Sequence, residues 1–198
     1  MEYLVTMTTQ VPDGTTEQAV ADMRARESVR ARELQDQGHM IRIWRPPLQP
    51  GEWRSLALFA AGDDGQLEDA LASMPLRVWR TDEVTPLAPH PNDPEIAGEK
   101  GDTEFLVKFT LSVPEGTPAQ TIDDAEAREA QRANDLAQNG HLRRLWKLPA
   151  PGQALGLWQA KDPAQMQQIL KSLPLDPWMK YQTTPLTPHP SDPVNSPA

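Results

Sequence analysis

The hydrophobic pattern of the chain opens with a strand-like alternation. Apolar side chains at Tyr3, Val5 and Met7 recur at every second residue, and the same period returns over residues 105–111. A period of two is typical of a β-strand with one buried face. The pattern therefore predicts an N-terminal strand and a second copy of it about halfway along the chain.

Each of these strands is followed by the signals of a long helix and then of further strands. The helical patterns end at Gly38 and Gly140, and glycine is the favoured residue just past a helix C-terminus. We expect more strands and a short helix in both halves, over residues 39–45, 55–60 and 66–73 and over 141–147, 155–160 and 164–172, before a last extended segment that ends in His-Pro. This order, β-α-β-β-α-β, is that of the ferredoxin-like split βαβ unit.

The two halves are one sequence repeated. The stretch EYLVTMTTQVPDGT from Glu2 returns as EFLVKFTLSVPEGT from Glu104, a displacement of 102 residues, which becomes 99 after a shortened turn. We predict a first repeat over 1–93, a polar linker over 94–102, a second repeat over 103–193 and a tail over 194–198. The Pro-, Asn- and Ser-rich end from Ser191 is expected to fray.

The fold class follows from this organisation. A four-stranded sheet with helices on one face only must cover its other face, and two such units in one chain can cover each other. We therefore expect an α+β protein, with two ferredoxin-like units packed sheet to sheet as an intramolecular dimeric α+β barrel.

Composition narrows the possible partners. The chain has 19 basic and 28 acidic residues and a net charge of −9, which disfavours nucleic acid and anionic membranes as partners. Cysteine is absent from the sequence, which excludes disulfides, thiolate nucleophiles and Cys-ligated metals. No apolar run is long enough to span a bilayer, and the N-terminus has no basic region of a signal peptide. We expect a soluble, cytoplasmic protein whose partner is a small molecule.

Two glutamates are the candidate catalytic residues. Glu27 and Glu129 occupy the same position in the two repeats, each in the centre of an apolar stripe of the long helix. Glutamate is rarely buried unpaired, and desolvation would raise its pKa toward the range useful for proton transfer. The structural alternative is an ion pair one helical turn away, with Arg30 or Arg132.

The strand after the long helix supplies candidate substrate-binding residues. Successive side chains of a strand point to opposite faces of the sheet, which puts Arg42 and Trp44 on one face and Arg45 on the other. Only one of the two arginines can therefore face a cavity. The second repeat adds Arg143, which by alternation shares a face with Lys147. A guanidinium at a cavity would bind a substrate carboxylate with two hydrogen bonds. The full set of candidates is Arg42, Trp44, Arg45, Arg144, Trp146 and Lys147.

Other kinds of site find no support in the sequence. The histidines form no cluster with metal-ligand spacing, and there is no glycine-rich phosphate loop or nucleophile elbow. We therefore predict no metal and no cofactor. The PHPxDP segments, residues 89–94 and 188–193, are too rigid for a random tail and could fold over the mouth of a site.

The pattern Glu27…Gly38…Ile43-Trp44-Arg45…Met74-Pro75-Leu76…His90-Pro91 resembles the muconolactone Δ-isomerase family, and the second repeat matches it again. The resemblance covers nearly all of each repeat. It implies a small ferredoxin-like protein without cofactor, and assembly into a ring of paired subunits. For this chain it implies a homo-oligomer of pseudo-dimers.

The resemblance also implies a reaction class. We expect an isomerase that moves a double bond by proton transfer in an unsaturated lactone or a related carboxylated small molecule, with Glu27 and Glu129 as acid–base residues. The alternatives are a cyclase of a polyketide or polyene pathway that uses the same cavity, and a non-catalytic binding protein. Because the first repeat keeps Trp44-Arg45 where the second has Trp146-Lys147, we expect the Glu27 site to carry more of the activity.

Overall fold

The computed structural model describes residues 1–94 and 102–195. These residues fall into two compact units: unit 1 consists of Met1–Leu87 and Thr187–Ala198, and unit 2 of Ala88–Leu186. Most of the linker expected between the repeats, and the last three residues of the expected tail, lie outside the described residues.

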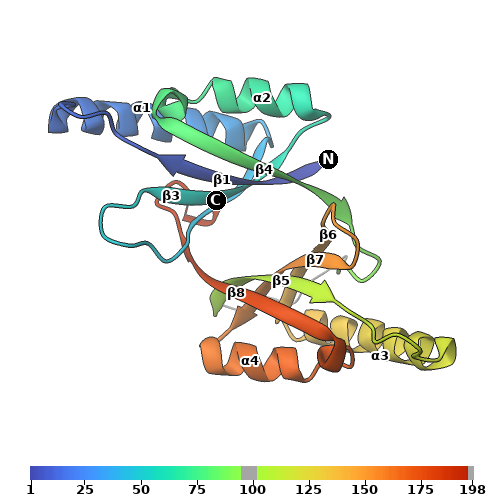
Figure 1. Ribbon diagram of the computed structural model, residues 1–198. Helices are drawn as coiled ribbons and strands as arrows, with labels where there is room; N and C mark the ends of the chain where they lie inside the picture. The colour runs from blue at the N-terminus through green and yellow to red at the C-terminus, as the bar shows by residue number, and fades with distance from the viewer. Residues whose placement is uncertain (95–101, 196–198) are drawn as a thin grey trace. The chain divides into compact units, whose positions relative to one another are not determined.

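Unit 1 is an antiparallel sheet covered on one face by two helices (Figure 1). Its strands are ordered β4-β1-β3-β2, so the first strand of the chain is central. Its elements are β1 (Glu2–Thr9), α1 (Glu17–Asp36), β2 (Met40–Arg45), β3 (Arg54–Ala60), α2 (Asp64–Ala72), the 3₁₀ helix η1 (Pro75–Trp79), β4 (Arg80–Pro89) and the 3₁₀ helix η3 (Pro193–Asn195).

Unit 2 repeats the same plan, with the strand order β8-β5-β7-β6. The predicted order β-α-β-β-α-β is thus present in both halves of the chain. Its elements are β5 (Thr103–Leu111), α3 (Ala119–Gln138), β6 (Leu142–Lys147), β7 (Gln153–Ala160), α4 (Pro163–Lys171), the 3₁₀ helix η2 (Asp176–Trp178) and β8 (Met179–Pro188).

The last strand of each repeat ends in the unit formed by the other repeat. Strand β4 pairs with β1 as far as Leu87, but its end, Ala88 and Pro89, pairs with Lys147 and Trp146 of unit 2. In the same way the end of β8, Thr187 and Pro188, pairs with β2 of unit 1. The residues that follow these strand ends therefore belong to the opposite repeat's unit, which the sequence pattern did not reveal.

Local signals fix the ends of the long helices. Thr16 is the N-cap of α1 and accepts a hydrogen bond from the Ala19 N–H. Gly38 and Gly140 both have φ of +74°, the left-handed conformation that glycine adopts without strain. The predicted glycine stops are confirmed.

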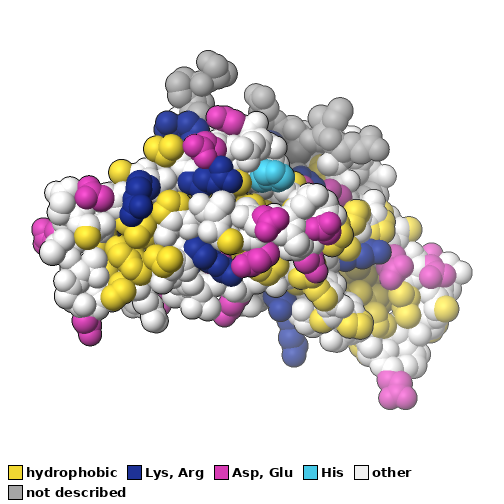
Figure 2. Space-filling model, turned by 90° about the horizontal axis from the view of Figure 1, so that it is seen from above, with side chains coloured by type: hydrophobic (Ala, Val, Ile, Leu, Met, Phe, Trp, Pro, Cys, Tyr) yellow, Lys and Arg dark blue, Asp and Glu magenta, His cyan; other side chains and the backbone are white. Residues whose placement is uncertain are grey.

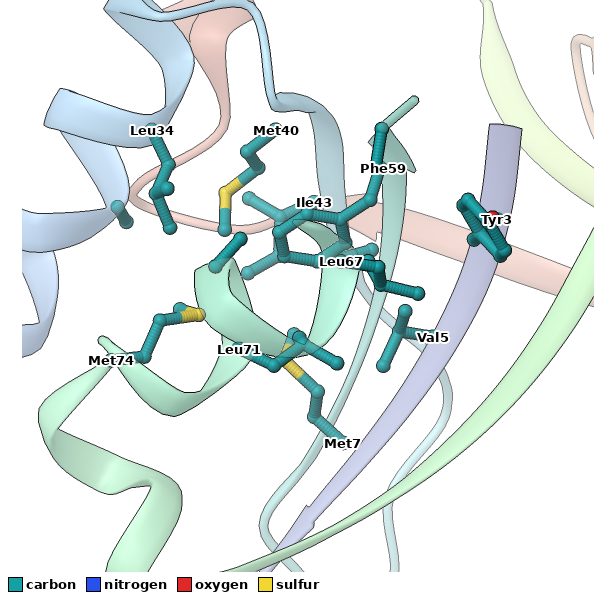
Figure 3. Packing of buried hydrophobic residues seen from close by; sticks show 14 residues of the cluster. Tyr3, Val5, Met7, Leu34, Met40, Ile43, Phe59, Leu67, Leu71 and Met74 are labelled. Atoms are coloured by element: carbon teal, nitrogen blue, oxygen red, sulfur yellow. The ribbon is translucent and has the colours of Figure 1, made fainter. Parts of the chain in front are cut away.

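The core of each unit lies between its sheet and its helices. In unit 1, Figure 3 shows Val5 and Met7 of β1, Phe59 of β3 and Leu71 of α2 pointing toward one another. The corresponding core of unit 2 is built around Phe105, Phe109 and Trp158. Every second residue of β1 is buried, as the alternation predicts.

Three details differ from the sequence expectations. The turns before β4 and β8 form the short 3₁₀ helices η1 and η2, which were not predicted. A β-bulge interrupts β6 between Leu142 and Arg144, and another interrupts β2. The region from Ser191 was expected to fray, but Asp192 is buried and Pro193–Asn195 forms η3.

The helix layer of unit 1 is a mixed charged surface. Figure 2 shows acidic and basic side chains interspersed over it, with hydrophobic side chains between them. Among the described residues, no helix combines the length and the apolar character needed to cross a bilayer.

Candidate active sites in two cavities

Each unit contains a cavity large enough for a small molecule. The candidate catalytic glutamate of that unit lies on the cavity wall. The cavities measure about 440 Å³ in unit 1 and about 460 Å³ in unit 2. Each is lined by the long helix and by neighbouring strands of that unit, and ligand pockets in proteins commonly fall in this range of volume. Glu27 lines the first cavity and Glu129 the second.

The His-Pro segment of one repeat lines the cavity of the other. His189, Pro190 and Ser191 line the cavity of unit 1, whereas His90 and Pro91 line that of unit 2. These segments thus line cavities, and each cavity takes its segment from the opposite repeat.

Ion pairs hold these segments in place. In unit 1, Arg42 Nε donates to Asp192 Oδ1 at 3.0 Å and Arg42 Nη2 donates to Oδ2 at 3.1 Å. In unit 2, Arg144 Nε lies 3.3 Å from an oxygen of Asp93, which also accepts a hydrogen bond from the Leu145 N–H. The side chain of Asp192 is fully buried, so its pairing with Arg42 is essential to bury the charge.

These pairs correct part of the predicted binding set. Arg42 and Arg144 were expected to hold a substrate carboxylate, but protein carboxylates already engage them. Their guanidinium groups also lie over the rings of Trp44 and Trp146, at 4.8 and 4.9 Å from the ring centroids. Both tryptophans are buried in the units and are absent from the cavity walls.

Arg45 and Lys147 do line the cavities, as strand alternation allows. Arg143 does not line the cavity of unit 2, although it was expected to share a face with Lys147. The reason is the bulge between Leu142 and Arg144, which places Leu142, Leu145 and Lys147 on the cavity side.

Glu27 is held by two partners in unit 1. Its Oε2 accepts a hydrogen bond from the Leu76 N–H at 2.8 Å, and its Oε1 accepts one from Arg80 Nη1 at 3.0 Å. The pair is nearly dry, because the side chains of Arg80 and Glu27 are 2% and 13% exposed. The sequence alternative, a pair with Arg30, is wrong: Arg30 pairs with Glu33 instead.

Arg80, which lines the cavity, also belongs to a network of ion pairs. Its Nε lies 2.6 Å from Asp82 Oδ1, and Arg77 pairs with both Asp82 and Glu68. The Asp82 side chain is buried, so this network fixes Arg80 against Glu27.

Glu129 has a different environment. Its Oε2 accepts a hydrogen bond from the Leu175 N–H at 3.0 Å, and no cation pairs with it among the described residues. Met179 replaces Arg80, and the position of Asp82 holds Tyr181, whose hydroxyl donates to Asp176 at 2.9 Å. The wall of the same cavity includes many apolar residues, among them Phe109, Leu142, Leu145, Trp158 and Leu173.

Burial raises the pKa of both glutamates. For Glu129, desolvation is the main cause, the Leu175 N–H opposes it, and the nearby Asp176 adds to it. For Glu27, desolvation again raises the pKa, but the Leu76 N–H and the Arg80 cation both act in the opposite direction. Only Glu129 therefore combines a raised pKa with a carboxylate oxygen left unengaged among the described residues.

The two histidines that line the cavities, His90 and His189, are in the neutral form. Burial lowers the pKa of His90, and the Lys147 charge lowers it further. Burial and Arg45 lower the pKa of His189 to about 4. In each ring Nδ1 accepts a backbone N–H, from Asn92 or Ser191, so the ring proton resides on Nε2.

One residue of the unit 1 cavity, Arg80, was missed from the sequence. Arg80 is distant from Glu27 along the chain, and only the helical neighbours of Glu27 were considered as partners. The signal was present in the aligned segments MPLRVWR and LPLDPWM, which end in Arg80 and Met179. Among residues 1–94 and 102–195 we find no group of three or more His, Asp or Glu side chains placed to share a metal ion.

These features define an α+β protein of two repeated units, each with a partly buried glutamate on the wall of a cavity of small-molecule size. The chain belongs to the muconolactone delta-isomerase family, whose model matches residues 1–93 and again residues 103–192. Each repeat therefore matches the family model separately.

Individual relatives agree with this assignment. The muconolactone delta-isomerase of Cupriavidus pinatubonensis (strain JMP 134 / LMG 1197) is 31% identical over 87 residues, which are 44% of this chain and 95% of that protein. Muconolactone Delta-isomerase 1 of Acinetobacter lwoffii is 30% identical over 87 residues, 44% of this chain and 91% of that protein.

Similarity of fold extends further than similarity of sequence. A haem-binding protein from Thermus thermophilus has a TM-score of 0.61 at 14% identity, covering 96% of this chain and 93% of its own. A chlorite dismutase mutant from Candidatus Nitrospira defluvii has a TM-score of 0.62 at 10% identity, covering 94% and 91%. At such identities the likeness concerns the fold alone.

Proposed function

We propose that the chain is an isomerase that moves a carbon–carbon double bond in an unsaturated lactone bearing a carboxylate, and that Glu129 of unit 2 is its acid–base residue. The observation that carries this proposal is the half-buried Glu129 carboxylate on a largely apolar cavity wall, without a cation partner among the described residues. Family membership supports the reaction class.

One carboxylate is sufficient for the chemistry. Glu129 removes the γ-proton of the conjugated lactone, and the C–H electrons move through the double bond to the carbonyl oxygen. The protonated Glu129 then returns the same proton to the α-carbon, so the double bond moves and the atoms of the substrate are conserved. A raised pKa suits a group that must act first as base and then as acid.

Two other residues of unit 2 have complementary roles. Lys147 is the cation on this cavity wall among the described residues, and it would hold the substrate carboxylate. The neutral His90 has its proton on Nε2 and would donate a hydrogen bond to the lactone carbonyl, where negative charge develops. Both groups stabilise charge without competing with Glu129 for the proton.

This assignment reverses our expectation that the Glu27 site carries more of the activity. In unit 1 the base would have to break a buried ion pair with Arg80 before it could accept a proton. Breaking such a pair leaves an uncompensated charge, which is strongly unfavourable. The sheet-to-sheet pairing of the units and their assembly into oligomers stay predictions from the sequence.

The test is turnover of a carboxylated unsaturated lactone in D₂O, followed by proton NMR. We expect the double bond to migrate, with deuterium at the α-carbon in proportion to exchange of the Glu129 proton with solvent. A cyclase would leave the lactone unchanged, and so would a protein that only binds it. Absence of migration and of exchange at every pH tested would contradict the proposal.

A further inference from the structure

The turn before β8 carries the backbone group that binds Glu129. Leu175 immediately precedes η2, and its N–H donates to Glu129 Oε2 at 3.0 Å. The next residue, Asp176, is the first of η2, and its own N–H donates to the Leu173 carbonyl at 3.0 Å. The position of the Glu129 carboxylate therefore depends on how this turn is held.

A tyrosine of β8 holds the turn. The Tyr181 hydroxyl donates to Asp176 Oδ1 at 2.9 Å, and it also lies 3.2 Å from the Leu170 carbonyl at the end of α4. The ring of Tyr181 meets that of Phe109 edge to face, with the centroids 5.6 Å apart. Burial raises the pKa of Tyr181, and the hydrogen bond to Asp176 raises it further, so the hydroxyl stays protonated and remains a donor.

The same three positions carry a different set of charges in unit 1. In the order unit 2 and then unit 1, the pairs are Asp176 and Arg77, Met179 and Arg80, and Tyr181 and Asp82. In unit 1 these positions supply a cation to the glutamate, since Arg80 pairs with Glu27. In unit 2 they supply a carboxylate, and no cation pairs with Asp176 or Glu129 among the described residues.

Asp176 differs from the other ionisable groups near Glu129. Burial is the main cause of the raised pKa of Glu129, and the charge that adds to it is that of Asp176. Neither Asp176 nor Tyr181 lines the cavity, so both would act on Glu129 and not on the substrate. The other groups are Glu126 of α3, Lys147 of β6 and His90 after β4, which line the cavity, and Arg132 of α3, which donates to Ser172.

We propose that Asp176, fixed by Tyr181, is a positioning residue of the unit 2 site. Through the adjacent Leu175 amide it orients the Glu129 carboxylate, and its negative charge favours the protonated form of Glu129 that returns the proton to the substrate. The Leu175 N–H favours the ionised form, and a like charge nearby disfavours it. A carboxyl that acts first as base and then as acid needs both influences. The inference rests on the isomerisation proposed for unit 2.

Asp176→Asn tests the effect of the charge, because asparagine keeps an oxygen acceptor for the Tyr181 hydroxyl. The pH profile of kcat/KM for a carboxylated unsaturated lactone is measured alongside the titration of the Glu129 carboxyl carbon by ¹³C NMR, whose signal is assigned from its loss in Glu129→Gln. Without the like charge, the ionised form of Glu129 becomes easier to reach. We therefore expect both the acid side of the profile and the carboxyl titration to move to lower pH. Asp123→Asn is the matched control, because Asp123 is an exposed aspartate of the same helix as Glu129.

Tyr181→Phe tests the positioning, because phenylalanine keeps the ring beside Phe109 and loses the hydroxyl. We expect kcat to fall about 10- to 100-fold with KM within a few-fold, because small misplacements of a reacting group have costs of this order. Tyr3→Phe is the matched control: the Tyr3 hydroxyl donates to Asp64 at 2.8 Å in unit 1, so this variant loses a similar hydrogen bond away from Glu129. It should keep the natural kcat.

Two results would overturn the inference. One is a profile and a Glu129 titration that stay in place in Asp176→Asn, and the other is an equal kcat in Tyr181→Phe and Tyr3→Phe. The NMR titration needs no substrate, so its outcome is separate from that of the proposed function. If the natural protein leaves the lactone unchanged, the proposed function fails, whereas the titration still decides whether Asp176 acts on Glu129. If Asp176→Asn does not fold, Asp176→Ser replaces it with the same expectation.

Discussion

Introducing a cation beside Glu129 should remove the isomerase activity. Met179 stands opposite Leu111 in the β5–β8 ladder, just as Arg80 stands opposite Thr9 in unit 1. In Met179→Arg the new guanidinium therefore begins from the position from which Arg80 reaches Glu27 at 3.0 Å. We expect it to pair with Glu129 in the same way.

The magnitude follows from the charges. Two unit charges about 4 Å apart attract by about 4 kcal/mol in a partly buried setting, against which the arginine must be desolvated. The net effect is a lower pKa of the Glu129 carboxyl than in the natural protein, because a nearby cation favours the ionised form. Glu129 then becomes a weaker base with its free oxygen occupied, and loss of general-base function reduces rates about 10²- to 10⁴-fold.

Steady-state turnover of the lactone measures this effect, with Met179→Leu as the control. Leucine keeps the volume and the apolar character of the site, so that variant should stay within a few-fold of the natural rate. Thermal unfolding checks that both variants are folded. A folded Met179→Arg protein with full turnover would refute the reasoning that an unpaired Glu129 is the basis of activity.

Three further predictions concern pH and packing. Because burial raises the pKa of Glu129, kcat/KM should fall on the acid side at a pH above the ordinary glutamate range, and a profile flat down to pH 4 would contradict this. Because the pKa of His189 is lowered to about 4, the unfolded chain binds its proton first, so stability should drop as pH falls from about 6.5 toward 4. His189→Gln should flatten that part of the curve of unfolding free energy against pH, and an unchanged slope would exclude His189 as its source. A Cβ on Gly156 would overlap Nε1 of the Trp158 ring, so Gly156→Ala should lose about 1–3 kcal/mol in urea unfolding through overpacking, whereas no loss would mean that the indole can move freely.

The regular elements were predictable because they rest on local signals. Alternation in β1, the glycine after each long helix and the repeat itself need no knowledge of tertiary contacts. Alternation also predicted that only one of Arg42 and Arg45 faces a cavity, and the structure shows that Arg45 does. It failed for Arg143, because a β-bulge adds one residue to a strand without a clear sequence mark.

The partners of the site residues were harder to predict because they are distant in sequence. The Glu27–Arg80 pair joins a helix to the start of β4, and the Arg42–Asp192 pair joins residues of different repeats. The comparison of the repeats nevertheless held the decisive information. Arg80 and Met179 occupy equivalent positions, and that one difference separates a paired glutamate from an unpaired one.

The most direct test of the account compares Glu129→Gln with Glu27→Gln in turnover of the carboxylated lactone. Both substitutions keep the size of the side chain, and circular dichroism confirms the fold before the assay. We predict that Glu129→Gln loses about 10²- to 10⁴-fold in kcat, whereas Glu27→Gln stays within a few-fold of the natural rate. The opposite pattern, with activity lost in Glu27→Gln and kept in Glu129→Gln, would show that the paired glutamate is the base and would contradict the account.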